Sequence, residues 1–168
     1  MASVINAGPV QVYHVIDSVE TQMGPTQGGV TLSFEFTTLD SLADITGEVA
    51  RDMYYTGMTA TITANYTELT FAQVLALFPA TDGNAVTLPI GCNARDDAIG
   101  LILRPIICGE VSSDDTLAIY APMVLPKPAF NVEFSLSNQR IWTVEYSVLP
   151  YDPRNNDFSM LFFGQTST

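Results

Sequence analysis

Basic residues are scarce in this chain, and their scarcity argues against one large class of function. Among 168 residues there are six Lys and Arg against 18 Asp and Glu, which gives a net charge of −12 and a pI of about 4.1. Proteins that hold nucleic acid by neutralising its phosphates need a basic surface. The chain is therefore not expected to bind DNA by electrostatic attraction.

Histidine and cysteine are also scarce, which leaves little for metal binding or nucleophilic catalysis. The one histidine, His14, falls in an expected strand, where a lone histidine is usually structural. Cys92 and Cys108 have no C-x-x-C spacing and are expected to be reduced, buried thiols. The Asp pairs at 96–97 and 114–115 lack the spacing of a calcium loop. We expect no catalytic residues, no metal and no cofactor.

Long apolar runs are missing as well. The longest, at residues 98–103 and 71–78, are far shorter than the roughly 20 residues of a membrane-spanning helix. The first ten residues, MASVINAGPV, have no basic residue before their apolar ones, so no signal peptide is expected. Apolar residues nevertheless make up 47% of the chain, enough for a packed core. We expect one domain over residues 1–168, with residues 1–12 as a candidate N-terminal arm.

Apolar and polar residues alternate along much of the chain. Val30, Leu32, Phe34 and Phe36 are each followed by a polar residue, as in a strand with one buried face. The same period recurs at residues 58–66, 130–136 and 142–148, the last two of which are expected to form a hairpin. Further strands are expected at residues 10–16, 99–108, 116–124 and 158–163. The fold class is mainly antiparallel β.

One segment has the period of a helix instead. Thr70 and Gln73 are spaced as a capping box, and Pro79 ends the pattern. Between them, the apolar residues that would share a helix face are Phe71, Val74, Leu75 and Phe78. The sequence predicts one short α-helix near residues 70–78.

Residues 37–57 are apolar but follow neither period, so a long loop is expected there. Loops of this length are uncommon unless they are functional or disordered, and apolar content argues against disorder. The loop either folds back on its own domain or docks on another subunit. For the second alternative the expected anchors at the interface between subunits are Leu42, Ile45, Val49, Met53 and Tyr54.

Two runs of the sequence carry a resemblance to a known family. Residues 28–79 read GGVTLSFEFTTLDSLADITGEVARDMYYTGMTATITANYTELTFAQVLALFP, and residues 128–164 read PAFNVEFSLSNQRIWTVEYSVLPYDPRNNDFSMLFFG. In their order of strand, long loop, threonine-rich strand, short helix and closing hairpin, they resemble the major tail tube proteins of long-tailed bacteriophages. The resemblance covers a little over half of the chain and includes no catalytic signature.

The resemblance implies a fold and an assembly. The fold would be two packed antiparallel β-sheets, as a sandwich or partly closed barrel, flanked by the short helix. Six copies would close a ring, and rings would stack into the hollow tube of a virion tail, assembled in the host cytoplasm. The expected partners are further copies of the chain, a tape-measure protein and tail-tip or terminator proteins, with DNA passing through unbound and no membrane involved.

The acidic character suits a conduit for DNA, because carboxylates on its wall repel phosphates. Glu35, Glu133 and Glu145 occupy outward positions of expected strands, and we expect them to face the lumen. They would also serve as ordinary solubilising residues. The alternatives from other classes are a capsid decoration protein, a tail-completion protein or a monomeric β binding module; an enzyme is a distant third, since the sequence selects no catalytic pair.

Overall fold

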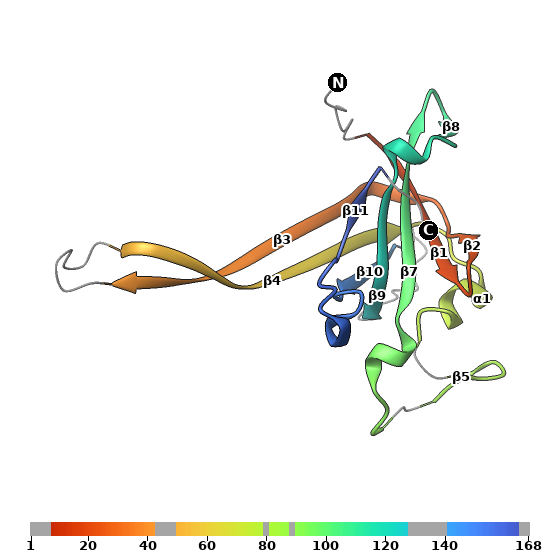
Figure 1. Cartoon of the computed structure of the whole chain (residues 1–168). Coiled ribbons are helices and arrows are strands. Elements are labelled where there is room, and N and C mark those ends of the chain that lie inside the picture. The colour runs from red at the N-terminus through yellow and green to blue at the C-terminus, as the bar shows by residue number, and fades with distance from the viewer. Residues whose placement is uncertain (1–7, 43–49, 79–80, 88–89, 128–140, 165–168) are drawn as a thin grey trace.

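The protein is described by a computed structural model that covers residues 8–42, 50–78, 81–87, 90–127 and 141–164. Most of these residues lie in one nine-stranded antiparallel sheet with the order β2-β1-β7-β9-β10-β4-β3, in which β8 also pairs with β7 and β11 with β9 (Figure 1). A second, two-stranded sheet contains β5 and β6. The strands are β1 (Val10–Ile16), β2 (Val19–Gln22), β3 (Thr26–Leu42), β4 (Ala50–Tyr66), β5 (Thr81–Asp82), β6 (Ala85–Val86), β7 (Ile99–Ile107), β8 (Glu110–Val111), β9 (Ile119–Lys127), β10 (Trp142–Val148) and β11 (Phe162–Phe163).

The mainly β, antiparallel fold class is confirmed, with two sheets of very unequal size. The larger sheet curls strongly but does not close into a barrel. Its two edge strands, β2 and β3, are joined by residues 23–25 alone, so the two edges must lie close in space. At this seam the Met23 amide donates to the Val12 carbonyl at 2.9 Å, and the Thr26 hydroxyl donates to the Val10 carbonyl at 3.4 Å.

The core fills the inside of the curl. Inward-facing residues of five strands are almost completely buried, as the period of two predicts. They include Val12, Ala60, Ile62, Ala64, Tyr66, Leu101, Leu103, Val124, Val144 and Tyr146. This one cluster, drawn from strands at both ends of the sheet order, holds the curl together by apolar burial.

The expectation of a long loop at residues 37–57 is wrong. Strands β3 and β4 are 17 residues each, and their pairing continues from Thr37 opposite Gly57 to Leu42 opposite Ala50. The register shifts between Thr37 and Thr38 and again between Ser41 and Leu42. A bulge places one extra residue in one strand and interrupts the alternation of faces, which is why the period was not visible in the sequence.

Most of the other expected strands are confirmed. Residues 10–16 form β1, residues 99–107 form β7 and residues 142–148 form β10. Strand β9 begins later than expected because Asp114 caps a 3₁₀ turn, η2 (Asp115–Leu117), through the Thr116 amide. Only the end of the expected strand at 158–163 pairs, as β11, and the expected strand at 130–136 lies outside the described residues. Two further 3₁₀ turns are η1 (Ala94–Asp97) and η3 (Pro153–Asn155).

The predicted short helix is present as α1 (Phe71–Leu75), with both hydrogen bonds of the capping box. The Gln73 side chain also donates to the Gln22 carbonyl at 2.9 Å, which attaches α1 to β2. Its predicted apolar face is only partly correct. Phe71 is 90% exposed, and Leu77, two residues beyond the end of the helix, is the buried residue instead.

Cys92 and Cys108 are free thiols, as expected, but both are exposed rather than buried. Cys108 has a positive φ of 53° in the turn between β7 and β8, a position that faces solvent because turns run over the surface.

The link between β2 and β3 generates a prediction about Gly24. A Cβ at Gly24 would lie 1.7 Å from the Glu68 carbonyl oxygen, which is part of the backbone and cannot move aside easily. Gly24→Ala is therefore expected to lower the free energy of unfolding by about 1–3 kcal/mol, measured by urea denaturation. Gly8→Ala, where a Cβ meets nothing within 4 Å, is the control; equal stability of the two variants would contradict the tight seam.

Candidate interaction surface

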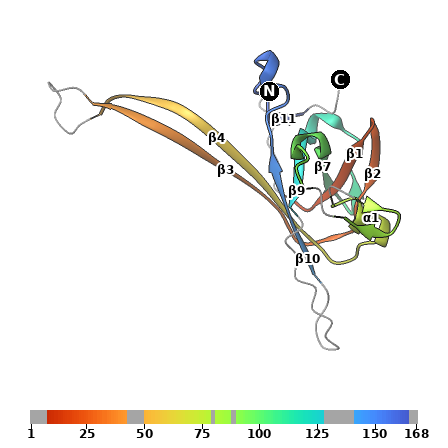
Figure 2. The ribbon, with the colours of Figure 1, turned by 90° about the horizontal axis from the view of Figure 1, so that it is seen from below.

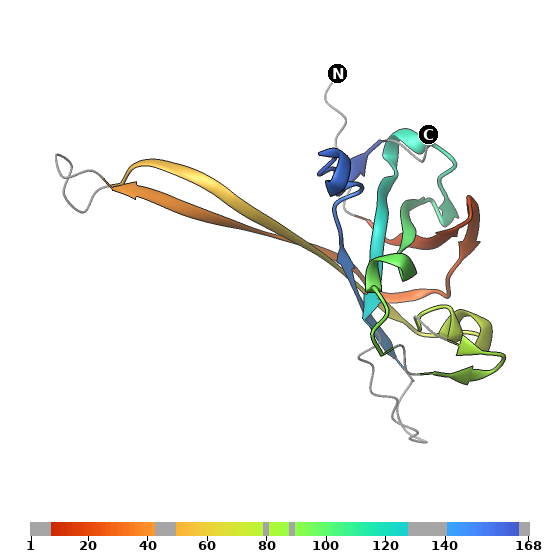
Figure 3. The ribbon, with the colours of Figure 1, turned by 60° about the horizontal axis from the view of Figure 1, so that its bottom comes forward.

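The outer part of the β3–β4 hairpin projects away from the rest of the protein. We call residues 34–42 and 50–59 the distal hairpin. Figures 1, 2 and 3 show it extending well beyond the curled sheet in all three views. Strand β10 pairs with β4 only as far as Val148 opposite Ala60. Beyond that point, within the described residues, β3 and β4 pair only with each other.

The inner, apolar face of the sheet continues onto the distal hairpin. Ala60 and Ile62 are buried, and directly opposite them lie Phe34 and Leu32. Further out on the same face follow Phe36 opposite Met58, then Tyr55 and Met53. We call the exposed members the apolar stripe: Phe34, Phe36, Met53, Tyr55 and Met58.

The side chains of the apolar stripe are well exposed: Phe36 is 58%, Met53 66% and Tyr55 79% accessible. Phe36 and Tyr55 contact each other edge to face, with ring centroids 5.8 Å apart. A row of large apolar groups continuous with the core, yet uncovered by it, is typical of a surface that binds another molecule.

As far as Thr37 and Gly57, the opposite face of the same strands is polar; farther out, the exposed Leu39 and Tyr54 occupy it. We call the polar part the hydroxyl face: Thr31, Ser33, Glu35, Thr37, Thr59, Thr61 and Thr63 of the hairpin with Thr143, Glu145 and Ser147 of β10. The Thr143 hydroxyl donates to the Asn65 side chain at 2.7 Å across the β10–β4 pair. One face of the sheet is thus closed by apolar packing and the other carries short hydroxyl side chains.

Two of the expected lumen residues are brought onto this one face. Glu35 lies opposite Thr59, and Glu145 lies opposite Thr63; both side chains are exposed. Glu145 also pairs with Lys127 of β9, at 3.4 Å between Nζ and Oε1. The third, Glu133, lies outside the described residues.

The expected interface residues are placed in part. Met53 and Tyr54 are exposed on the distal hairpin but on opposite faces, because adjacent residues of a strand point to opposite sides. Leu42 pairs with Ala50 near the tip, and Ile45 and Val49 lie outside the described residues.

Sequence reasoning missed the other members of the stripe. Phe34 and Phe36 have the alternating pattern of core residues. No local signal separates a strand position inside the core from one beyond it.

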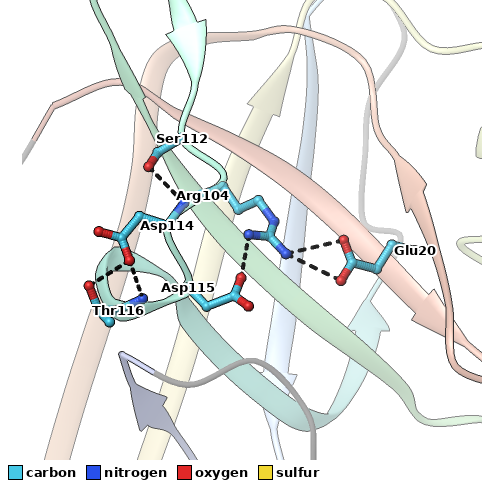
Figure 4. Close-up of polar contacts among 6 residues, drawn as sticks. All are labelled: Glu20, Arg104, Ser112, Asp114, Asp115 and Thr116. Atoms are coloured by element: carbon cyan, nitrogen blue, oxygen red, sulfur yellow. Dashed lines mark hydrogen bonds and ion pairs between the residues drawn. The ribbon is translucent and has the colours of Figure 1, made fainter.

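A cluster of polar contacts links the edge strand β2 to β7 and to the 3₁₀ turn η2 (Figure 4). The Arg104 guanidinium donates to Asp115 at 2.7 Å and to both oxygens of Glu20 at 3.3 and 3.4 Å, and it lies 5.9 Å from the centre of the Tyr13 ring. Asp114 accepts from the Thr116 amide and hydroxyl, and these bonds lower the pKa of Asp114. Each charged group of this cluster therefore has partners from its own chain, which is the arrangement of a structural contact.

The described residues offer little for chemistry. A surface hollow of about 510 Å³ is lined by Asp17, Asp96 and Asp97 together with Tyr120 and Tyr151. Within the described part of the chain, no group of three or more His, Cys, Asp or Glu is placed to hold a metal ion. Nor does that part contain a helix long and apolar enough to cross a lipid bilayer.

Comparison with known proteins identifies no family. No family model and no curated protein matches the chain. Among solved structures, the chain aligns with one from a study described as "Cryo-EM structure of the anti-feeding prophage (AFP) baseplate, 6-fold symmetrised", at 9% identity and a TM-score of 0.45, over 99% of this chain and 100% of that one. Similarity at this level does not establish a shared fold.

The Arg104 cluster generates a prediction about stability. Arg104→Met is expected to lower the free energy of unfolding by about 1 kcal/mol, because its mostly buried guanidinium bonds to two carboxylates from different elements. The matched control is Lys127→Met, which breaks the exposed pair with Glu145 and is expected to change stability by less than about 0.5 kcal/mol. Equal effects in urea denaturation would contradict the structural role of Arg104.

Proposed function

We propose that the protein is a structural component of a virion, a major tail tube protein that forms hexameric rings stacked into a hollow conduit for the genome. The observation that carries the proposal is the β3–β4 hairpin, which has the apolar stripe on one face and, as far as Thr37, the hydroxyl face on the other. The resemblance of residues 28–79 and 128–164 to tail tube proteins supports the same assignment.

The apolar stripe supports self-association. Burying a large apolar side chain is worth roughly 1.5–3 kcal/mol, so the stripe as a whole represents a substantial driving force. The described part of the chain does not cover it, because the distal hairpin projects away from the curled sheet (Figure 2). Of the two readings of residues 37–57, the geometry therefore favours docking on another subunit.

The exposed edges of the sheet also favour a second copy of the same chain as the partner. The distal parts of β3 and β4 present backbone donors and acceptors on both outer edges, and such edges are a liability in a free monomer. Closed rings of identical subunits remove them, because every copy supplies both the edge and its cover. Stacking of rings through the distal hairpin would bury the apolar stripe in the same assembly.

The hydroxyl face supports a role as the wall of a DNA conduit. Short hydroxyl side chains offer a polyanion no cation to bind, and Glu35 and Glu145 add repulsion. Lys127, on the same face, is paired with Glu145. In this proposal DNA passes without being held, a tape-measure protein occupies the tube before ejection, and tail-tip or terminator proteins close its ends. The protein has no enzymatic activity and needs no cofactor.

Disrupting the apolar stripe is expected to block assembly. Phe36→Asp with Tyr55→Asp should leave a folded subunit, because both side chains are already in solvent, and should prevent rings and tubes from forming. The matched control, Thr37→Asp with Thr59→Asp, puts two carboxylates on the hydroxyl face and should still assemble. Electron microscopy and sedimentation of purified protein, with circular dichroism to check folding, measure the outcome.

Two results would contradict this assignment. Wild-type protein that remains monomeric at high concentration and is absent from isolated tails would favour a monomeric binding module. Assembly by the Phe36→Asp and Tyr55→Asp variant would place the interface elsewhere.

Reversing charge on the hydroxyl face is expected to slow the passage of DNA. Particles with Glu35→Lys and Glu145→Lys should form tubes, but their ejection of DNA should slow at low salt, where new lysines hold phosphates most strongly. Glu110→Lys changes an exposed residue of β8, which pairs with β7 and not with the strands of this face, and is the control. Ejection by the double variant at the wild-type rate would show that the hydroxyl face is not the wall of the lumen.

A further inference from the structure

A buried chain of polar contacts crosses the inside of the curl. His14 is only 1% exposed, and its Nε2 lies 2.9 Å from the Tyr146 hydroxyl, which lies 2.9 Å from the Tyr66 hydroxyl. These residues belong to β1, β10 and β4, and β7 and β9 separate β1 from β10 in the sheet order. The His14–Tyr146 contact therefore joins strands that are not neighbours in the sheet, and the Tyr146–Tyr66 contact lies between the paired strands β10 and β4. We call them the hydroxyl–imidazole bridge.

A neutral imidazole can form both contacts of the bridge. In one arrangement Tyr66 donates to Tyr146, which donates to Nε2; in the other, Nε2 donates to Tyr146, which donates to Tyr66. Both use one hydrogen for each contact and leave the buried Nδ1 of His14 without a partner. A protonated imidazole could still donate from Nε2 to the Tyr146 hydroxyl, but it would bury a positive charge and an N–H at the unpartnered Nδ1, and burying such a group is costly.

Among the residues that the structure describes, the surroundings of His14 offer no charge to balance a proton. Its neighbours in the adjacent strands are Thr21 of β2 and Leu101 of β7, and the groups of β10 and β4 that face it are the two tyrosines. Burial lowers the pKa of His14 to about 4. Burial also raises the pKa of Tyr66 and of Tyr146, so both remain protonated hydroxyls.

The nearby charged groups lie on the other side of the sheet. Glu20 pairs with Val15, and Arg104 with Gln11, so both belong to the face that carries Tyr13. Glu145 lies on the hydroxyl face, opposite to the side chain of Tyr146. Within the described residues, the interior around His14 thus contains apolar groups and two phenols.

We propose that the hydroxyl–imidazole bridge is an acid-sensitive switch, which holds β1 against β10 and β4 while His14 is neutral and opens this contact when His14 takes up a proton. The ladders of β1 with β2 and β7 need not break, because the bridge lies across the interior rather than along a ladder. A charged imidazole reaches water most directly when β1 moves away from β10 and β4. The switch concerns the individual subunit and does not depend on tube assembly.

The direction of the pH effect follows from proton binding. The unfolded chain, with an ordinary histidine pKa near 6.5, binds more protons than the folded chain between about pH 4 and pH 6.5. The contribution of neutral His14 is therefore complete above pH 6.5 and is lost as the pH falls toward 4. Over that range the folding equilibrium constant should drop on the order of 100-fold through His14 alone.

The test compares the full-length wild type with His14→Gln, which can still hydrogen-bond to Tyr146 but does not titrate. Both proteins carry the same 18 Asp and Glu, so the difference between their pH profiles isolates His14. Urea denaturation between pH 4 and pH 7.5 can be followed by fluorescence of Trp142, the single tryptophan, which lies opposite Tyr66. The wild type should lose on the order of 100-fold more than the variant; parallel profiles would overturn the proposal.

A second measurement holds even if the variant does not fold. His14 is the single histidine, so its ring protons can be followed by NMR in the wild type without assignment of other signals. The proposal requires that the folded protein resist protonation until well below pH 6 and that the nuclear Overhauser contacts between the adjacent His14 and Tyr146 rings be lost when it occurs. Titration near pH 6.5 in a protein that stays folded, or ring contacts that persist after protonation, would overturn it.

Discussion

One face of the large sheet is apolar from the seam onto the distal hairpin, and the described residues cover it only inside the curl. Inside the curl, burial of this face supplies the core, with residues such as Ile62 and Tyr146 almost inaccessible. On the distal hairpin the same face has nothing of the described chain against it. Folding of the domain and association with a partner therefore draw on one continuous surface and on the same physical force.

The interior of the curl is closed by polar as well as apolar contacts, and the two have different consequences. Apolar burial holds the strands together at any pH, whereas the buried site of the His14–Tyr146 contact disfavours the charged form of the histidine. A buried polar network with every member paired specifies a unique arrangement, and one with an unpartnered atom, here Nδ1 of His14, remains sensitive to its environment. The polar contacts therefore favour one particular arrangement of the core, in addition to stabilising it.

Much of the fold could be predicted from the sequence because the period of two and the capping box are local patterns. Residues 10–16 and the helix at Thr70 were found from such patterns. The distal hairpin was not, because a bulge places Tyr55 and Met58, three residues apart, on the same face and breaks the period. The contact between His14 and Tyr146 joins residues 132 positions apart. Phe36 has the pattern of a core residue, and the sequence does not show that it lies beyond the curled sheet. These features depend on tertiary geometry, which local spacing does not contain.

The short link between β2 and β3 gives the hairpin a mechanical consequence. Residues 23–25 connect the β2 edge, next to His14, directly to the base of β3, so a displacement at the seam is passed to the start of a long, stiff ribbon. At about 3.4 Å per residue, the part of β3 beyond Phe34 acts as a lever arm of roughly 27 Å. A rotation of about 10° at its base would carry the tip through roughly 5 Å, on the scale of one side chain. Small changes inside the curl are thus amplified at the surface farthest from it.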